Sequence, residues 1–407
     1  MERINIFATI IIPGHGQMDT FDVAVIGAGP AGSMAARYAA KAGARTVLLE
    51  EHPAVGWPVQ CAGLLGSEAL AESELGPGPF LLRGMKGASI VSPGGRILDF
   101  KAKSCKAWVV DRRLFDRTMA ANAVAEGARL ELCSAVRSIS RNEQGCTLHL
   151  DEGRELFVTV VISAEGVSAK LAREAGISPP QMVLSGAQVE VPFKVNDPEK
   201  VEVHLGQAPG LFAWVIPLGE GRARIGLAAR DRGCERLRAF LKRPGIAERL
   251  LGSAVALNVG GLPLGTAAVT AVQGLLAVGD AAGQVKPTSG GGIFPGLVAA
   301  KIAGGVAAAA SLEGDSSSAR LAEYDRLWRA ALGRELETGM RLHRVLTRMS
   351  HDEIDELVGY LAGRPKLTRS IEEFGDIDRP SRLMARLLPH LDLDAIRLAR
   401  LLGYALG

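Results

Sequence analysis

The chain begins with an alternation of apolar and amphipathic stretches. Residues 21–26 are apolar, residues 30–42 carry apolar positions at helical spacing, and residues 46–49 are apolar again. A strand, a helix and a second strand within about thirty residues form a βαβ unit. The pattern therefore predicts an α/β fold that starts with a parallel sheet.

Glycines and one acidic residue stand at the ends of these elements. Gly27, Gly29 and Gly32 follow the first strand with G-x-G-x-x-G spacing, and Glu50 follows the second strand. Such glycines permit a tight turn, close approach of a pyrophosphate to backbone N–H groups and close helix packing, while the acid hydrogen-bonds a ribose. We therefore predict a dinucleotide-binding domain. The alternative is a tight turn beside an unrelated surface glutamate.

A second glycine-rich turn lies late in the chain. The stretch VGDAAGQVKPTSGGGIFPG, residues 278–296, places Gly279 and Asp280 among small residues. It then runs through three consecutive glycines: Gly290, Gly291 and Gly292. An Ala-rich helix is expected over 293–312, and Lys301 with several glycines favours a buried helix over a membrane span. Backbone amides left open at a helix start suit an anion or an electron-rich ring.

The Gly279-Asp280 turn resembles the second FAD fingerprint of the flavoprotein hydroxylase superfamily. The resemblance implies that Asp280 bonds the ribityl chain and that the three glycines lie against the isoalloxazine ring. The helix behind the turn would direct its positive end toward the flavin. FAD rather than NAD is therefore the expected cofactor.

Two further segments resemble elements of the same superfamily. Arg112, with Phe115 and Asp116, matches its R-x-x-F-D element, which implies that Arg112 lies near the ribityl or phosphate groups of FAD. The segment AEGVS matches its ADG-x-x-S element, with Glu165 in place of the usual Asp. Taken alone, each segment could equally be a salt-bridged surface helix or a strand followed by a turn.

Three stretches resemble the geranylgeranyl reductase family, which hydrogenates isoprenoid double bonds. They are PVQCAGLL at 58–65, PGLFAWVIP at 209–217 and GDAAGQVKPTSGGGI at 279–293. The resemblance implies an FAD-dependent reductase of a polyprenyl lipid, with hydride transfer from reduced flavin. The geranylgeranyl group would be carried on a glycerophospholipid or a diphosphate.

The second stretch resembles the lipid-contacting motif of that family. Trp214 is kept, whereas Phe212 replaces a tyrosine and Ile216 replaces a phenylalanine. Both replacements keep the face apolar, so these three side chains are expected to contact the polyprenyl chain. The alternative is an ordinary strand that packs alternate residues on one face.

Cys61 is the expected catalytic residue, because the family resemblance places it close to the flavin. A thiol there could donate the proton that alkene reduction needs, gate the motion of the ring, or pack as a small hydrophobe. The five cysteines lack a CxxC pair, which argues against a disulfide framework and against a zinc site and favours a reducing, cytoplasmic setting. The other four are expected to be structural, and His204 is expected at the surface.

Composition narrows the range of partners. The formal net charge of the 407 residues is +3, and no basic block suggests a nucleic-acid surface. The sequence shows no second nucleotide-binding domain for NADPH, so a transient donor is expected to reduce the flavin: ferredoxin, a reduced deazaflavin or NAD(P)H. Peripheral contact with a membrane is compatible with the Leu-rich segment 381–407.

The positions of these motifs predict a Rossmann-type FAD-binding domain in three pieces, with an inserted antiparallel sheet. The FAD-binding pieces are 18–66, 103–176 and 262–312; the antiparallel-sheet substrate domain takes 67–102 and 177–261, where apolar and polar residues alternate between Gly-rich turns. A C-terminal helical subdomain is expected over 319–407. Residues 1–17 are interpreted as an arm or as a stretch that precedes the natural start at Met18.

Two other functions remain open from the sequence. The first is a flavin-dependent monooxygenase or halogenase of an apolar substrate. The second is a flavin-containing lipid-binding protein without catalysis.

Overall fold

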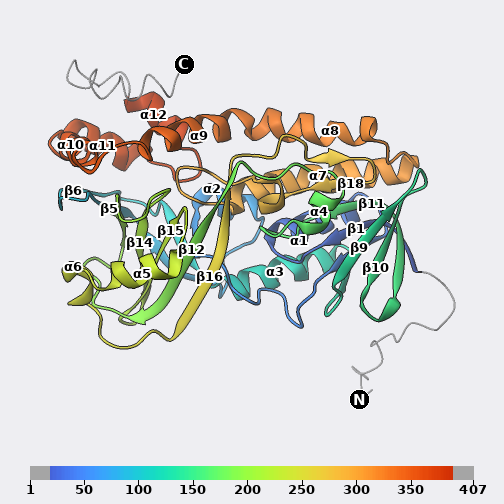
Figure 1. Ribbon diagram of the computed structural model, residues 1–407, viewed down its shortest axis with the longest axis horizontal. Coiled ribbons are helices and arrows are strands. Elements are labelled where there is room, and N and C mark those ends of the chain that lie inside the picture. The colour runs from blue at the N-terminus through green and yellow to red at the C-terminus, as the bar shows by residue number, and fades with distance from the viewer. Residues whose placement is uncertain (1–18, 388–407) are drawn as a thin grey trace.

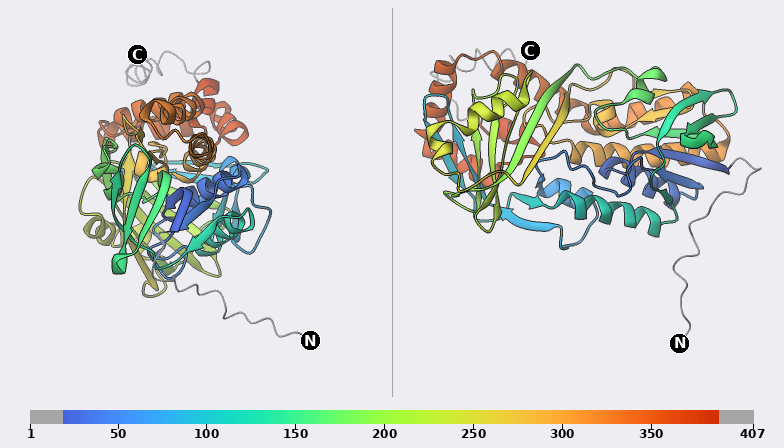
Figure 2. Two further views of the ribbon diagram at one scale, coloured as in Figure 1. Left: turned by 90° about the vertical axis from the view of Figure 1, so that its right-hand side faces the viewer. Right: turned by 60° about the horizontal axis from the view of Figure 1, so that its bottom comes forward.

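The computed structural model describes residues 19–387 and has two sheet-containing halves bridged by helices (Figure 1). Helices α8 (Ser318–Trp328) and α9 (Arg334–Leu346) run one after the other along the top of both halves in Figure 1. The right-hand view of Figure 2 shows the two sheets side by side, and the left-hand view shows the orange and red C-terminal helices above them.

The first half is built on five parallel strands in a doubly wound arrangement. In spatial order they are β8 (Arg129–Glu131), β2 (Thr46–Leu49), β1 (Asp19–Ile26), β11 (Glu155–Ser163) and β18 (Leu275–Ala277). Strand order reverses between β1 and β11, which is where such sheets bind ligands at their carboxyl ends. The predicted strands at 21–26 and 46–49 correspond to β1 and β2. The antiparallel strands β9 (Val136–Arg141), β10 (Cys146–Leu150) and β17 (Ala271–Val272) extend this sheet.

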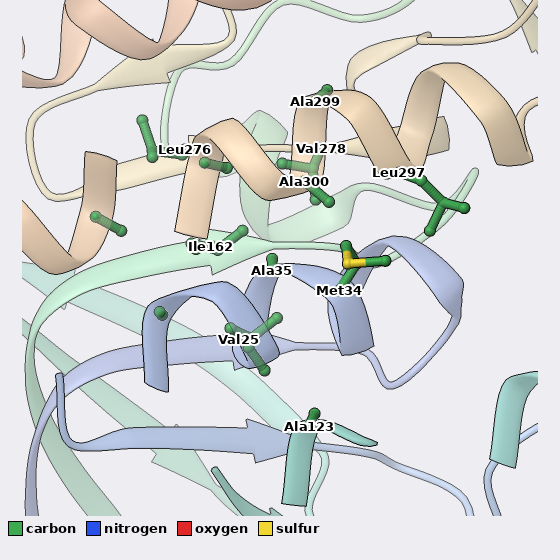
Figure 3. Packing of buried hydrophobic residues seen from close by; sticks show 14 of the residues in the cluster. Val25, Met34, Ala35, Ala123, Ile162, Leu276, Val278, Leu297, Ala299 and Ala300 are labelled. Atoms are coloured by element: carbon green, nitrogen blue, oxygen red, sulfur yellow. The ribbon is translucent and has the colours of Figure 1, made fainter. Parts of the chain in front are cut away.

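The core of this half is formed by helices α1 (Pro30–Lys41) and α7 (Ile293–Glu313) on the parallel sheet (Figure 3). Val25 and Ile162 from the sheet pack with Met34 of α1 and Leu297 of α7. A Cβ atom on Gly304 would lie 2.4 Å from the carbonyl oxygen of Ala35, so this glycine lets the two helices touch. Helix α3 (Arg112–Ala125) adds to the same core.

The second half is a seven-stranded sheet. Its order is β16 (Ala256–Leu264), β12 (Met182–Pro192), β15 (Arg222–Ala229), β14 (Ala213–Gly219), β13 (Lys200–His204), β5 (Gly87–Val91) and β6 (Ile97–Lys101). We expected it to be wholly antiparallel, which is wrong at one place, because β13 and β5 are parallel. The chain passes through the first half between these two strands, so no hairpin forces them to run antiparallel. The boundary expected at residue 262 falls inside β16.

Smaller elements fill the junction and the outer face. A three-stranded sheet of β3 (Leu64–Gly66), β7 (Ala107–Val110) and β4 (Leu81–Met85) adjoins helix α2 (Ser67–Glu72). Helices α5 (Gly233–Leu241) and α6 (Pro244–Ala247) pack on β12, β14 and β15. The segment after β11 forms the short helix α4 (Lys170–Glu174).

The C-terminal helices pack on both halves. Tyr324 and Trp328 of α8 are fully buried in the core of the first half. Helices α10 (His351–Ala362) and α11 (Pro365–Phe374) cover β5 and β6 through a cluster that includes Leu98 and Ile354. The predicted helical region therefore joins the two halves, and α12 (Pro380–Leu387) ends the described chain.

Helix α7 is long and apolar enough to cross a membrane, but 67% of its apolar window is buried in the core. Its Lys301 makes ion pairs with Glu72 and Glu74, at 2.9 and 2.7 Å. The expectation of a buried helix here agrees with this packing. The expected arm at 1–17 and most of the Leu-rich segment 381–407 lie outside the described residues.

Candidate active site

The first glycine turn has a distinct use for each glycine. Gly27 has φ +98°, and a Cβ there would lie 2.5 Å from the carbonyl oxygen of Ala164. A Cβ on Gly32 would lie 1.8 Å from the carbonyl oxygen of Gly27, so this position admits only glycine. A Cβ on Gly29 would meet no protein atom within 4 Å. Gly29 is also the N-cap of α1, and no side chain caps the helix there. The first backbone amides of α1 therefore face open space, which is what a bound pyrophosphate requires.

Glu50 lies at the carboxyl end of β2 and faces the same turn. Its Oε2 accepts a hydrogen bond of 2.9 Å from the backbone N–H of Ala28, and its Oε1 accepts one of 3.0 Å from the N–H of His52. His52 Nδ1 also lies 2.7 Å from Oε1, so Oε2 is the oxygen that keeps a lone pair for a further donor. Glu50 therefore anchors the turn and can still accept from ribose hydroxyls.

Asp280 lies at the carboxyl end of the parallel sheet. Its Oδ1 would be 2.9 Å from a Cβ on Gly292, so the carboxylate faces the start of α7. Burial raises the pKa of Asp280 to about 6, although Arg112 acts to lower it. Within residues 19–387 no hydrogen-bond donor contacts this carboxylate. A half-buried carboxylate without a donor is suited to the hydroxyl groups of a ribityl chain.

The Asp280 turn is held by a buried network that sequence reasoning missed. The backbone N–H of Gly279 donates to Gln284 Oε1 at 2.8 Å, and Gln284 Nε2 donates to Tyr324 Oη at 2.9 Å. Tyr324 in turn donates to the carbonyl of Ala277 at 2.8 Å. Tyr324 comes from α8, so the C-terminal helices stabilise the turn directly.

The three consecutive glycines have different surroundings. A Cβ on Gly290 would lie 2.9 Å from Leu262, and one on Gly291 would lie 2.8 Å from Cε of Lys286. Gly292 is the uncapped N-cap of α7 beside Asp280. Gly292 therefore lies both beside the Asp280 carboxylate and at the uncapped amides of α7. Gly290 and Gly291 instead make room for the side chains of Leu262 and Lys286.

Lys286 forms a buried ion pair that sequence reasoning also missed. Its Nζ lies 2.6 Å from Oδ1 of Asp378 and donates to the carbonyl of Ile377 at 2.8 Å. Oδ2 of Asp378 accepts from the N–H of Ala69 at 2.9 Å. The signal in the sequence is a lone lysine among small and apolar residues. This pair joins the glycine loop to the C-terminal segment and to α2.

Arg112 begins α3 and is nearly buried. It makes a bidentate pair with Asp116, with N–O distances of 2.9 and 2.9 Å. Burial opposes its charge, but the neighbouring Asp116 and Cys61 raise the pKa of Arg112 above its ordinary value. The charge of Arg112 also acts to lower the pKa of Asp280.

The loop that carries Cys61 is fixed from the second half. Gln188 Nε2 donates to the carbonyl of Cys61 at 2.8 Å, and Arg224 Nη1 donates to the carbonyl of Ala62 at 3.0 Å. The N–H of Gly63 points at the sulfur, 3.4 Å away. A Cβ on Gly63 would lie 2.5 Å from Nη1 of Arg224 and 3.7 Å from Cγ of Arg112, so both arginines border this loop.

The sheet opposite this loop presents Trp214 next to Gln188. Both flank Gly226 on neighbouring strands, and a Cβ there would lie 2.6 Å from the indole and 2.5 Å from Gln188. Phe212 meets Trp214 edge to face, with ring centroids 6.3 Å apart. Trp214 Nε1 and Gln188 Oε1 are buried and lack a partner among residues 19–387. A donor and an acceptor without partners mark this face as one that a ligand or water covers.

Two predicted positions have ordinary packing roles. Ile216 follows Trp214 on the same face but is buried against Met85 and Val109, in a closed cluster between sheets. His204, expected at the surface, is partly buried beside α5, where it packs edge to face on Phe240.

Glu165 caps a helix. Its carboxylate accepts from the backbone N–H groups of Leu171 and Ala172, each at 2.9 Å, and from the hydroxyl of Ser163 at 2.6 Å. Both oxygens are thus used within the protein. The glutamate that stands in place of the usual aspartate therefore caps the first N–H groups of α4.

Among the other cysteines, Cys146 is buried, and burial raises its pKa to about 11. Such a thiol is inert and packs as a hydrophobe. Cys133 is exposed, so core packing does not explain it.

Comparison with known proteins agrees with this geometry. The profile of the lycopene cyclase protein family matches residues 22–356. A digeranylgeranylglycerophospholipid reductase of Methanocaldococcus jannaschii is 35% identical, over 83% of this chain and 90% of its own. The chain belongs to the geranylgeranyl reductase family. A second such reductase, from Methanothermobacter thermautotrophicus, is 34% identical over 84% of this chain and 92% of its own.

Solved structures of the family and its wider fold agree. A geranylgeranyl bacteriochlorophyll reductase-like protein of Thermoplasma acidophilum has a TM-score of 0.79 and 27% identity, covering 92% of this chain and 100% of its own. The flavin-dependent brominase Bmp2, at 16% identity and a TM-score of 0.70 over 87% and 92% of the two chains, shares the fold alone. The predictions of an FAD cofactor and an oxidoreductase of this family are confirmed.

Proposed function

We propose that this flavoprotein hydrogenates the double bonds of geranylgeranyl chains carried on a glycerophospholipid or a diphosphate. The proposal rests on one observation: the Cys61 loop lies between the FAD-binding turns and the Trp214 face. Arg112 from the FAD side borders this loop at Gly63, where a Cβ would lie 3.7 Å from its Cγ, and Gln188 from the sheet binds the carbonyl of Cys61. The relatives named digeranylgeranylglycerophospholipid reductase support the lipid class.

The chemistry requires a hydride and a proton on neighbouring carbons. Reduced FAD supplies the hydride equivalent when it is bound. In the proposal, Phe212 and Trp214 would hold the alkene beside the cofactor site, and the Cys61 thiol would give its proton to the second carbon. Arg112 and Arg224 border the loop that carries this thiol. Asp280 and the amides at the start of α7 fix the position of the cofactor.

Electrons come from outside the chain in this proposal. Ferredoxin or a reduced deazaflavin binds transiently, and NAD(P)H is the alternative donor. The lipid is taken from the cytoplasmic face of a membrane by peripheral contact. Rapid anaerobic reduction of the flavin by NADPH alone would contradict the proposal that ferredoxin or a reduced deazaflavin is the donor.

The test is anaerobic turnover of digeranylgeranylglycerophospholipid by dithionite-reduced holoprotein, with mass spectrometry of the lipid. A gain of two hydrogens per double bond supports the proposal, because each reduction adds one hydride and one proton. A product containing oxygen after exposure to air would indicate a monooxygenase, and a bound but unchanged lipid would indicate a binding protein. Cys61→Ala and Cys61→Ser address the proton: undiminished turnover in both variants would remove the donor role and leave gating or packing.

A further inference from the structure

A cavity of about 140 Å³ lies between α9 and the loop that precedes the three glycines. Its apolar wall is made by Val285, Pro287, Leu336 and Met340. Its polar rim is made by Gln181, Glu337, Arg341 and Arg344. This volume is roughly ten times what one water needs, so the cavity has room for a phosphate group.

The cationic side chains at the rim lack acidic partners. Within residues 19–387 neither Arg341 nor Arg344 makes an ion pair, and Arg344 donates only to Gln181 Oε1, at 3.0 Å. Glu337 is one helical turn from Arg341 yet lies outside ion-pair distance. Arg230, on the other side of Gly210, is likewise without an ion pair in this part of the chain. Unpaired guanidinium groups that converge on a cavity are suited to a phosphate.

A buried histidine connects the rim to the lipid-contacting motif. His343 Nε2 donates to the carbonyl of Gly210 at 2.6 Å, and its Nδ1 is buried without a partner among the described residues. Burial lowers the pKa of His343, and the charges of Arg230 and Arg344 lower it further. Arg344 is the next residue of α9, and Cγ of Arg230 would lie 3.1 Å from a Cβ on Gly210, so both arginines border the residues that hold this histidine.

The apolar wall continues toward Trp214. Val285, which lines the cavity, belongs to the same cluster as Leu211, Leu262 and Trp214. The apolar wall of the cavity is therefore part of the cluster that contains Trp214.

We infer that Arg341 and Arg344 bind the phosphate of the polyprenyl lipid and that Val285 and Leu262 direct its chain toward Trp214. This inference rests on the proposed function for the identity of the lipid. The site recognises a phosphate ester that carries an apolar chain. A phosphate without the chain would lack the contacts with Val285 and Leu262 and should bind more weakly.

The test measures binding rather than turnover, on oxidised holoprotein. The probes are geranylgeranyl monophosphate, neutral geranylgeraniol and inorganic phosphate. Arg341→Gln/Arg344→Gln should weaken binding of the monophosphate by about tenfold or more, because charge-assisted hydrogen bonds are lost, and leave geranylgeraniol within about twofold. The matched control is Arg326→Gln/Arg334→Gln, which removes two arginines of the same helical layer outside the cavity and should change neither.

The site would be overturned if the Arg341→Gln/Arg344→Gln variant bound geranylgeranyl monophosphate and geranylgeraniol equally more weakly, or if it bound both as well as the wild type does. It would also be overturned if the wild-type protein bound neither compound. If inorganic phosphate bound as tightly as geranylgeranyl monophosphate, the inferred recognition of the lipid chain would be overturned. The cavity would then be a site for free phosphate. Because no reaction is needed, these outcomes are distinct from failure of the proposed function. That failure would appear as a lipid that binds through the arginines and gains no hydrogen.

Discussion

The side-chain amide of Gln188 holds the backbone carbonyl of Cys61 at 2.8 Å, across the junction of the two halves. The seven-stranded sheet thus sets the position of the thiol relative to the FAD-binding turns. Gln188→Leu should leave that carbonyl without its donor, lower the free energy of unfolding by about 1–3 kcal/mol and reduce turnover. Urea unfolding and steady-state kinetics check this.

The matched control is Gln273→Leu. Gln273 also donates to a backbone carbonyl, that of Asn142 at 3.3 Å, but it is exposed. Its loss should change the free energy of unfolding by no more than about 0.5 kcal/mol. Equal effects of the two substitutions would show that the position of Cys61 does not depend on Gln188.

The glycines of the first turn make a second prediction. Gly29→Ala meets no protein atom, so the variant should fold with near wild-type stability but lose FAD affinity by about tenfold or more, because the methyl group occupies the space beside the α1 amides. Gly32→Ala should instead destabilise the fold itself, because its methyl group collides with Gly27. Thermal melts of FAD-free protein and FAD titration separate the two effects. Tight FAD binding by Gly29→Ala would contradict the assigned pyrophosphate site.

Asp280 predicts a pH dependence of the FAD-free protein. Its pKa is raised to about 6 in the fold from an ordinary 3.8, so folding favours the protonated form. The stabilisation from this group is full below about pH 4 and is lost as the pH rises through 6. Asp280→Asn imitates the protonated state at every pH. The variant should be more stable than wild type by about 1–3 kcal/mol at pH 7 and equal to it near pH 4, while binding FAD more weakly. A stability difference that does not change with pH would contradict this.

The buried pair of Lys286 and Asp378 predicts a coupling between the glycine loop and the C-terminal segment. Lys286→Met leaves an uncompensated buried carboxylate and should cost about 3–5 kcal/mol of unfolding free energy. Lys286→Met/Asp378→Asn removes that charge and keeps an acceptor for Ala69, so it should recover a large part of the loss. Urea unfolding of the two single variants and the double variant measures the coupling. Strictly additive effects would mean that the pair is not coupled.

The local parts of the site could be predicted from the sequence. Strands β1 and β2 follow from short apolar runs, and the spacing of Gly27, Gly29 and Gly32 depends only on one turn. Asp280 was found for the same reason, since it stands among small residues directly before a helix. Cys61 and Trp214 were predicted as site residues from the resemblance to a family, because the hydrophobic periodicity of the sequence does not reveal their roles.

The rest depends on contacts between distant parts of the chain. Gln188 is 127 residues from Cys61 along the sequence, and Lys286 is 92 residues from Asp378, so no local pattern pairs them. The parallel pairing of β5 with β13 also depends on the path of the chain through the first half. The uses of Gly290 and Gly291 were missed because their neighbours, Leu262 and the side chain of Lys286, are set by tertiary packing.

The most direct test of the reductase is a single anaerobic turnover. Holoprotein reduced by one equivalent of dithionite is mixed with digeranylgeranylglycerophospholipid, and the return of the oxidised flavin spectrum is followed while the lipid is analysed by mass spectrometry. The predicted result is reoxidation of the flavin in step with the gain of two hydrogens by the lipid, without oxygen. A flavin that stays reduced until oxygen enters, with the lipid unchanged or oxygenated, would contradict the reductase.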